Sequence, residues 1–174
     1  MEGWRLLGYG GTVEHEYREA VAVLVSGVRR VLGERLIALA VYGSVVRGVA
    51  RSDSDVDVLI VADQLPRGPR ARRQLVGAPV DEAEAVLHRS RPDGWISVVL
   101  KTREEVEQGG PLFYDMTLRD HIEILHDPEG WFASFLERLR GKMAALGAVR
   151  RRDVSGHPYW DLKPDWKPGD VIDL

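Results

Sequence analysis

Residues 43–57 read GSVVRGVARSDSDVD, and an apolar run lies on either side of them. The preceding run, 36–42, has β-branched and aromatic members near its end, which predicts a buried strand. The following run, 56–62, predicts a second strand that opens on acidic residues. A strand, a glycine turn and a strand that begins with carboxylates therefore form one short unit.

The turn in this unit has the features of an anion site. Gly43 lacks a Cβ, so the backbone can turn there and a ligand can approach closely. Ser44 is a favourable helix N-cap, and the backbone N–H groups at the start of a short helix attract phosphate. Arg47 and Arg51 lie in the same loop and would add positive charge near a bound phosphate.

Asp55 and Asp57 stand two residues apart at the start of the second strand. Residues i and i+2 of a strand point to the same face, with Cα atoms about 6.5–7 Å apart. Magnesium is bound in proteins through one or two carboxylates together with substrate phosphates. The pair therefore predicts a Mg²⁺ site beside the phosphate turn, and the whole unit indicates phosphoryl-transfer chemistry on a nucleotide.

The spacing of these residues resembles the signature of the DNA polymerase beta-like nucleotidyltransferase superfamily, and within it the small minimal nucleotidyltransferases. The matching positions are Gly43-Ser44, Arg47-Gly48-x-Ala50 and Ser54-Asp55-x-Asp57. The resemblance implies an α/β (α+β) fold, with a small mixed β-sheet and helices packed mainly on one face. It also implies that an NTP is bound with Mg²⁺ and that a nucleoside monophosphate is transferred to an acceptor.

The resemblance further implies roles for individual residues. Asp55 and Asp57 would be the catalytic residues that hold the metal. The residues expected to contact the nucleotide are Gly43, Ser44, Arg47 and Ser54.

A third metal-binding carboxylate of the family is not evident in this chain. The strand predicted over residues 95–101 contains no acid, and Ser97 stands where we expect that group. Asp93 is followed by Gly94, which is typical of a turn before the strand. Because the third carboxylate is the natural general base for an incoming hydroxyl, the sequence supports nucleotide binding better than catalysis. A water molecule or a substrate group could serve as the base instead.

Length and composition limit the other classes of function. The 174 residues predict a nucleotidyltransferase domain over 1–150 and an arm rich in proline and aromatic residues over 151–174. The net charge of −3 gives no basic footprint, so we expect no nucleic-acid partner. The absence of cysteine excludes a thiolate nucleophile. Without an apolar run of about 18 residues or a signal peptide, the expected compartment is the cytoplasm.

The remaining segments predict mainly helices. One runs from a cap at Thr12 to Leu32, and a long one begins with Pro128 at its first helical position. Thr102 and Glu105 predict a capping box, and residues 121–126 predict an edge strand. The arginines that follow the second strand are expected to be solvated surface: Arg67, Arg70, Arg72 and Arg73.

Three functions remain open at this stage. The first is an enzyme that transfers AMP from ATP and Mg²⁺ to a hydroxyl of a protein or a small molecule. The second, taken from the resemblance, is an antitoxin-type module that binds a small helical HEPN-like toxin. The third is a nucleotide-binding protein with weak catalysis. The arm at 151–174 would pack on its own domain, or would wrap a partner or a second copy in a homodimer.

Overall fold

The computed structural model describes residues 13, 15–51, 54–172 and 174 of the chain. A four-stranded sheet has the order β3–β2–β1–β4, with β1 at Leu36–Tyr42, β2 at Val56–Ala62, β3 at Ile96–Lys101 and β4 at Ile122–His126. Strand β1 is antiparallel to β2 and to β4, whereas β2 and β3 are parallel. The sheet is therefore mixed, and the predicted α/β fold class is confirmed.

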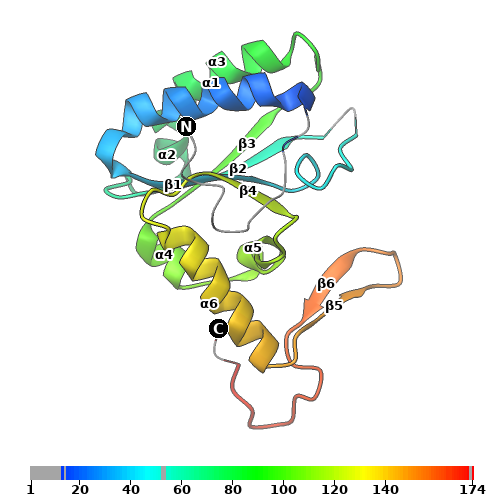
Figure 1. Cartoon of the computed structure of the whole chain (residues 1–174). Coiled ribbons are helices and arrows are strands. Elements are labelled where there is room, and N and C mark those ends of the chain that lie inside the picture. The colour runs from blue at the N-terminus through cyan, green and yellow to red at the C-terminus, as the bar shows by residue number, and fades with distance from the viewer. Residues whose placement is uncertain (1–12, 14, 52–53, 173) are drawn as a thin grey trace.

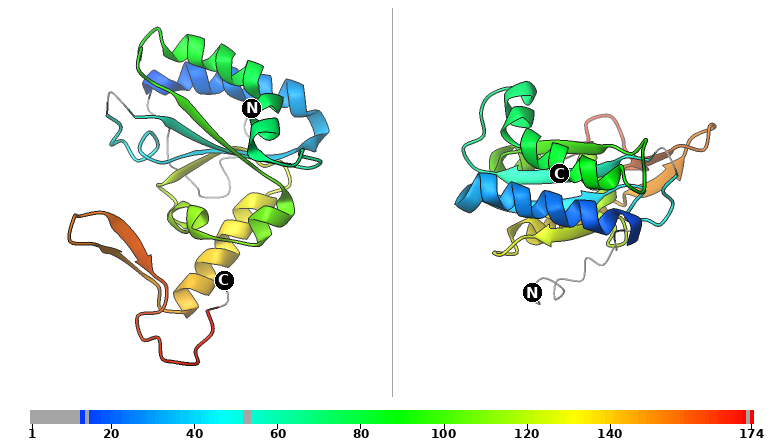
Figure 2. Two further views of the ribbon diagram at one scale, coloured as in Figure 1. Left: turned by 180° about the vertical axis from the view of Figure 1, so that it is seen from behind. Right: turned by 90° about the horizontal axis from the view of Figure 1, so that it is seen from above.

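Two helices cover one face of this sheet, as the view from above shows (Figure 2). They are α1, His15–Leu32, and α3, Gly77–Leu87, and the short α2, Pro69–Leu75, precedes α3. The two long helices approach closely, because a Cβ at Gly27 of α1 would lie 2.9 Å from the Cβ of Pro79 in α3. The predicted cap Thr12 lies outside the described residues.

The opposite face carries α4 at Arg103–Glu107, α5 at Pro111–Tyr114, the 3₁₀ turn η3 at Asp115–Thr117, and α6 at Trp131–Ala145 (Figure 1). Phe132 and Leu136 of α6 are fully buried in one cluster with Leu59 of β2. The expectation that helices pack mainly on one face is therefore wrong. The central strands β1 and β2 are apolar on both sides, so each side needs a covering layer.

The long helix α6 begins later than its sequence predicts. Its first residue is Trp131 and Gly130 precedes it in a left-handed conformation, so Pro128 is not the first helical residue. The carboxylate of Asp127 accepts hydrogen bonds from the backbone N–H groups of Phe132 (3.2 Å) and Ala133 (2.9 Å). Asp127 therefore satisfies N–H groups of the first turn from outside the helix.

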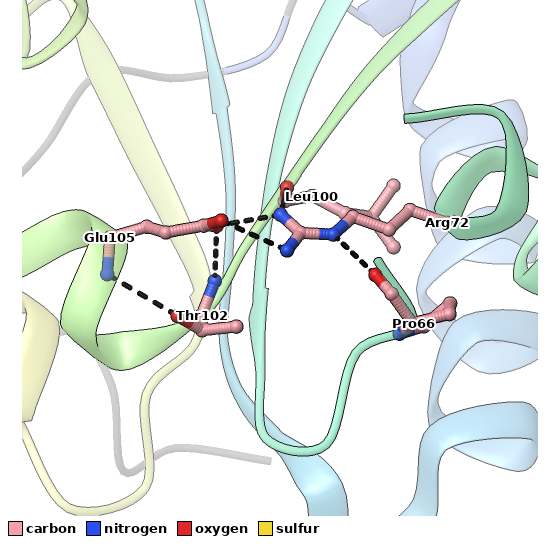
Figure 3. Close-up of polar contacts among 5 residues, drawn as sticks. All are labelled: Pro66, Arg72, Leu100, Thr102 and Glu105. Atoms are coloured by element: carbon pink, nitrogen blue, oxygen red, sulfur yellow. Dashed lines mark hydrogen bonds and ion pairs between the residues drawn. The ribbon is translucent and has the colours of Figure 1, made fainter. Parts of the chain in front are cut away.

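Arg72 of α2 joins that helix to the corner between β3 and α4 (Figure 3). Its guanidinium donates to Glu105 Oε2 (2.6 Å) and Oε1 (2.9 Å), and also to the carbonyl oxygens of Leu100 and Pro66. Glu105 is at the same time part of the predicted capping box with Thr102, which is confirmed. The expectation that Arg72 is solvated is wrong, since its side chain is 17 % exposed and ion-paired.

The C-terminal part begins with an antiparallel hairpin of β5, Val149–Arg152, and β6, Pro158–Asp161. The boundary expected between residues 150 and 151 thus falls inside a strand. Trp160, Leu162 and Leu174 pack against the apolar cluster of α6, so the described part of the arm contacts its own domain. None of the described helices combines the length and the apolarity needed to cross a lipid bilayer.

Candidate functional site

The end of β1 and the starts of β2, β3 and β4 meet at one edge of the sheet, because β1 runs opposite to β2 and β4. The strand register aligns four residues in a row across this edge: Ser97, Asp57, Tyr42 and Ile122. Residues in register on neighbouring strands point to the same face. Ile122 belongs to the apolar cluster of α5 and α6, and Tyr42 packs against that cluster. Asp57, in the same row, therefore faces the layer of α5 and α6.

A pocket of about 330 Å³ lies at this edge. Nine residues line it: Tyr42, Gly43, Ser44, Arg47, Asp57, Leu112, Asp115, Met116 and His121. The structure thus brings four of the predicted site residues together in one space. In Figure 1 the turn after β1, α5 and the β5–β6 hairpin all lie at this edge of the molecule.

Gly43 has two reasons to be glycine. Its φ of +84° lies in the left-handed region that L side chains rarely adopt. A Cβ at this position would also lie 2.5 Å from Oδ2 of Asp57, which no real contact tolerates. Gly48 in the same loop has a φ of +67°, but a Cβ added there would meet nothing within 4 Å. Of these two glycines, only Gly43 is packed against a carboxylate.

The chain after Gly43 forms a turn rather than the short helix that Ser44 was expected to cap. The N–H of Arg47 donates to the carbonyl of Gly43 (3.3 Å), and that of Val49 donates to the carbonyl of Ser44 (3.2 Å). The helix prediction is therefore wrong, and Val45 and Val46 of the turn are buried in the core. Ser44 lines the pocket without capping a helix.

Asp57 is an unfavourable place for a negative charge. Burial raises the pKa of its carboxyl, the neighbouring Asp55 raises it further, and the positive charge of Arg47 acts in the opposite direction. Burial and the charge of Asp57 also raise the pKa of Tyr42 to about 12, so this phenol is protonated at neutral pH. A bound cation would relieve the repulsion at Asp57.

The two carboxylates fit a magnesium ion that completes its coordination with substrate. The described residues contain no group of three or more His, Cys, Asp and Glu residues that could hold a metal. Asp55 and Asp57 alone still match the usual protein contribution to such an ion, which is one or two carboxylates beside phosphate oxygens and water. Asp57 is half-buried in the pocket lining, whereas Asp55 is exposed and is not among the lining residues.

One predicted nucleotide contact, Ser54, lies outside the pocket lining. Its hydroxyl accepts a hydrogen bond from the N–H of Arg51 (2.8 Å), and its own N–H donates to the carbonyl of Arg51 (3.0 Å). Ser54 therefore closes the turn that leads into Asp55. Its contact with a nucleotide stays a prediction.

A second set of lining residues, Leu112, Asp115, Met116 and His121, is absent from the sequence-based prediction. Oδ1 of Asp115 accepts from Arg150 Nε (3.0 Å) and Trp160 Nε1 (2.8 Å), and Oδ2 accepts from Arg150 Nη2 (2.9 Å). These partners lie 35 and 45 residues further along the chain. No local motif could have indicated these partners, because Arg150 and Trp160 lie far from Asp115 in the sequence.

Asp115 and His121 adjust each other's protonation. Burial acts to raise the pKa of Asp115, but the hydrogen bonds from Arg150 and Trp160 and the charges of Arg150 and His121 hold it below its ordinary value. Burial lowers the pKa of His121, as do the charges of Arg150 and Arg47, against the opposing charges of Asp120 and Asp115. Within the described part of the chain, Nδ1 of His121 is buried without a hydrogen bond, 3.8 Å from Asp115 Oδ2.

The chain belongs to the nucleotidyltransferase domain family, which matches residues 25–121, more than half of the sequence. The matched segment runs from within α1 to the residue before β4 and contains all nine pocket residues. The family resemblance seen in residues 43–57 is thereby confirmed.

No curated protein matches the chain. Among solved structures, it is similar to one described as a crystal structure of a toxin-antitoxin with AMP-PNP. The sequence identity is 15 %, the TM-score is 0.49, and the match covers 72 % of this chain and 87 % of the other.

Proposed function

We propose that the protein binds an NTP with Mg²⁺ and transfers its nucleoside monophosphate, preferably AMP, to a hydroxyl group of a protein or a small molecule. The observation that carries this proposal is the pocket at the sheet edge, which gathers Gly43, Ser44, Arg47 and Asp57. Nucleotidyl transfer needs mainly positioning and charge neutralisation, so a small set of residues is sufficient.

Each residue of the turn has a distinct task in this proposal. Gly43 lets the Asp57 carboxylate lie directly against the turn, where a Cβ would be 2.5 Å from Oδ2, and leaves the turn open to the triphosphate. The Ser44 hydroxyl and the Arg47 guanidinium would hydrogen-bond phosphate oxygens, the latter as a charged donor. Tyr42, protonated at neutral pH, is a further donor in the lining.

Asp55 and Asp57 would hold the magnesium ion. Such an ion neutralises phosphate charge and orients the reacting group. The carboxyl of Asp57 must be ionised for this task, although burial and Asp55 raise its pKa. Arg47 works against that shift and so favours the ionised form.

The proposal is tested by calorimetric titration of a non-hydrolysable ATP analogue in the presence of Mg²⁺. We expect binding to the natural protein, a loss of at least about 100-fold in affinity for Asp57→Asn, and no change for Asp63→Asn. Asp63 is a matched control, because it is an exposed aspartate that follows the other end of β2. A folded Asp57→Asn variant that binds with unchanged affinity would contradict the proposal.

A second candidate function is an interaction module that binds a small helical toxin-like protein or a second copy of the chain. Several large apolar side chains of the C-terminal part are exposed, among them Val154, Tyr159 and Trp166. Light scattering of the isolated protein tests the homodimer. Co-expression with a helical protein encoded by a neighbouring reading frame tests the toxin-like partner. For either candidate the cytoplasm is the compartment we propose.

A further inference from the structure

The pocket lacks a carboxylate at the position where the family carries its third acid. Ser97 is in register with Asp57 on the neighbouring parallel strand, and strands of a sheet are about 4.8 Å apart. A serine hydroxyl does not accept a proton at neutral pH unless another group takes its own. If the protein catalyses transfer, another group has to receive the proton of the incoming hydroxyl, and the other side chains of the lining are candidates.

The lining contains three groups that can accept a proton: Asp57, Asp115 and His121. Asp57 is assigned to the metal in the proposed function. Both carboxylate oxygens of Asp115 already accept hydrogen bonds, three in all, from Arg150 and Trp160. His121 is the remaining group, and among the described residues its Nδ1 has no hydrogen-bond partner.

The position of His121 suits the task. It directly precedes Ile122 of β4, and the register runs from Ile122 through Tyr42 to Asp57 across two strand spacings, about 10 Å. Since His121 and Asp57 line the same pocket, a phosphate held at Asp57 and a hydroxyl beside His121 share one space. The space that both side chains line has a volume of about 330 Å³.

The surroundings of His121 keep it neutral and oriented. Its side chain is 12 % exposed, and the charged groups that act on it are Asp120, Asp115, Arg150 and Arg47. Nδ1 faces Asp115 Oδ2 at 3.8 Å, which is longer than a hydrogen bond. Catalytic hydrogen bonds are often long without substrate and shorten in the complex. An N–H at Nδ1 that points to Asp115 would leave Nε2 as the basic nitrogen.

We propose that His121 is the general base of the transfer and that Asp115 is the residue that positions it. This inference rests on the proposed function. The acceptor oxygen attacks the α-phosphorus of the NTP, and a new O–P bond forms. The bond between that phosphorus and the bridging oxygen breaks, so pyrophosphate leaves. The proton of the acceptor hydroxyl moves to Nε2 of His121.

The inference assigns a purpose to the C-terminal hairpin. Arg150 of β5 and Trp160 of β6 both donate to Asp115, so the hairpin fixes the carboxylate that faces His121. Asp115 and its two partners are then positioning residues, because they act on the reaction only through His121.

The experiment measures pyrophosphate release from Mg·ATP with water as the acceptor, together with calorimetric binding of the non-hydrolysable analogue. We expect His121→Gln to lower kcat by about 100-fold or more, since a general base typically contributes 10²–10⁴-fold. Its affinity for the analogue should stay within about threefold of the natural protein. The matched control is His126→Gln, a half-buried histidine at the far end of β4 that does not line the pocket, and its kcat should be unchanged.

The pH dependence of kcat provides a second readout that needs no variant at His121. The natural protein should lose activity on the acid side as His121 becomes protonated, and Asp115→Asn should move that limb to lower pH, because it removes a negative charge beside the imidazole. A kcat for His121→Gln within about threefold of the natural value would overturn the inference. The inference would also be overturned if kcat of the natural protein did not fall at acid pH. The same holds if the natural protein binds the analogue but releases no pyrophosphate from Mg·ATP.

These outcomes separate the two proposals. If the natural protein does not bind the analogue with Mg²⁺, the proposed function fails and this inference with it. If binding is present and depends on Asp57 but His121→Gln has no effect, only the inference about His121 fails.

Discussion

The two sides of the pocket are held in place in different ways. The turn wall, consisting of Gly43, Ser44, Arg47 and Asp57, comes from one local unit whose backbone bonds span a few residues. The α5–β4 wall consists of Leu112, Asp115, Met116 and His121. It is fixed through Asp115 by Arg150 and Trp160 of a distant hairpin.

The difference indicates a division of labour. A wall built from one short stretch of the chain is suited to the proposed task of holding phosphate and metal. The α5–β4 wall depends on long-range contacts, so a substitution in the β5–β6 hairpin can alter it and leave the turn wall intact. We therefore expect damage to the turn wall to abolish nucleotide binding, and damage to the α5–β4 wall to spare binding and lower turnover.

The largest effect should come from Gly43→Ala, measured against Gly48→Ala. Both glycines have positive φ, so either alanine strains the backbone and costs about 1 kcal/mol or more of stability. Only at Gly43 would the new Cβ meet the Asp57 carboxylate. We expect calorimetry to show that Gly43→Ala lowers the affinity for the ATP analogue with Mg²⁺ by at least about 100-fold. Gly48→Ala should change this affinity by less than about threefold. Equal losses would remove the special role of the Gly43–Asp57 contact.

A gain should come from Ser97→Asp, which restores a carboxylate in register with Asp57. The added charge should raise Mg²⁺ affinity, about tenfold, because the ion offsets carboxylate repulsion. Pyrophosphate release should rise as well, and most clearly in a His121→Gln background, where the new carboxylate can accept the proton. If the double variant is no faster than His121→Gln alone, Ser97 does not occupy the third-acid position.

An intermediate effect should come from Arg150→Met, measured against Arg151→Met. Both arginines belong to β5 and both form ion pairs, but Arg150 bonds to Asp115 and Arg151 to Asp161. Arg150→Met should lower pyrophosphate release about tenfold with little change in binding of the analogue, and should cost about 1 kcal/mol of stability. A larger effect on binding than on turnover would contradict the division between the two walls.

The smallest effect concerns the pH dependence of the free energy of unfolding. The native pKa of His121 lies below its ordinary value of about 6.5, so the unfolded chain takes up this proton first as the pH falls. The free energy of unfolding should therefore decrease as the pH falls below about 6.5, and His121→Gln should lessen this decrease. Urea unfolding at about pH 7.5 and about pH 5.5, on either side of the ordinary histidine pKa, measures this decrease in the free energy of unfolding. An identical decrease in both proteins would mean that His121 is not buried in its neutral form.

The sequence predicted the turn wall because its residues are near neighbours with a spacing that phosphate and metal chemistry require. Strands β1 and β2 and the capping box at Thr102 were also predicted in place, since each is defined by local pattern. Asp115 and His121 were not, because their importance arises from contacts with residues far along the chain. The second helical layer was missed although the nearly continuous apolar runs of β1 and β2 indicate burial on both faces, because the expectation of helices mainly on one face was taken from the family resemblance.

The central claim is that the Gly43–Ser44 turn holds the phosphates and that Asp55 and Asp57 hold the metal ion. The most direct test is a crystal structure with a non-hydrolysable ATP analogue and Mn²⁺, a cation that is visible by anomalous scattering. The account predicts an anomalous peak bound to Asp57 and Asp55, with the triphosphate against the Gly43–Ser44 turn. A triphosphate bound elsewhere, or an ion with no contact to Asp57, would contradict it.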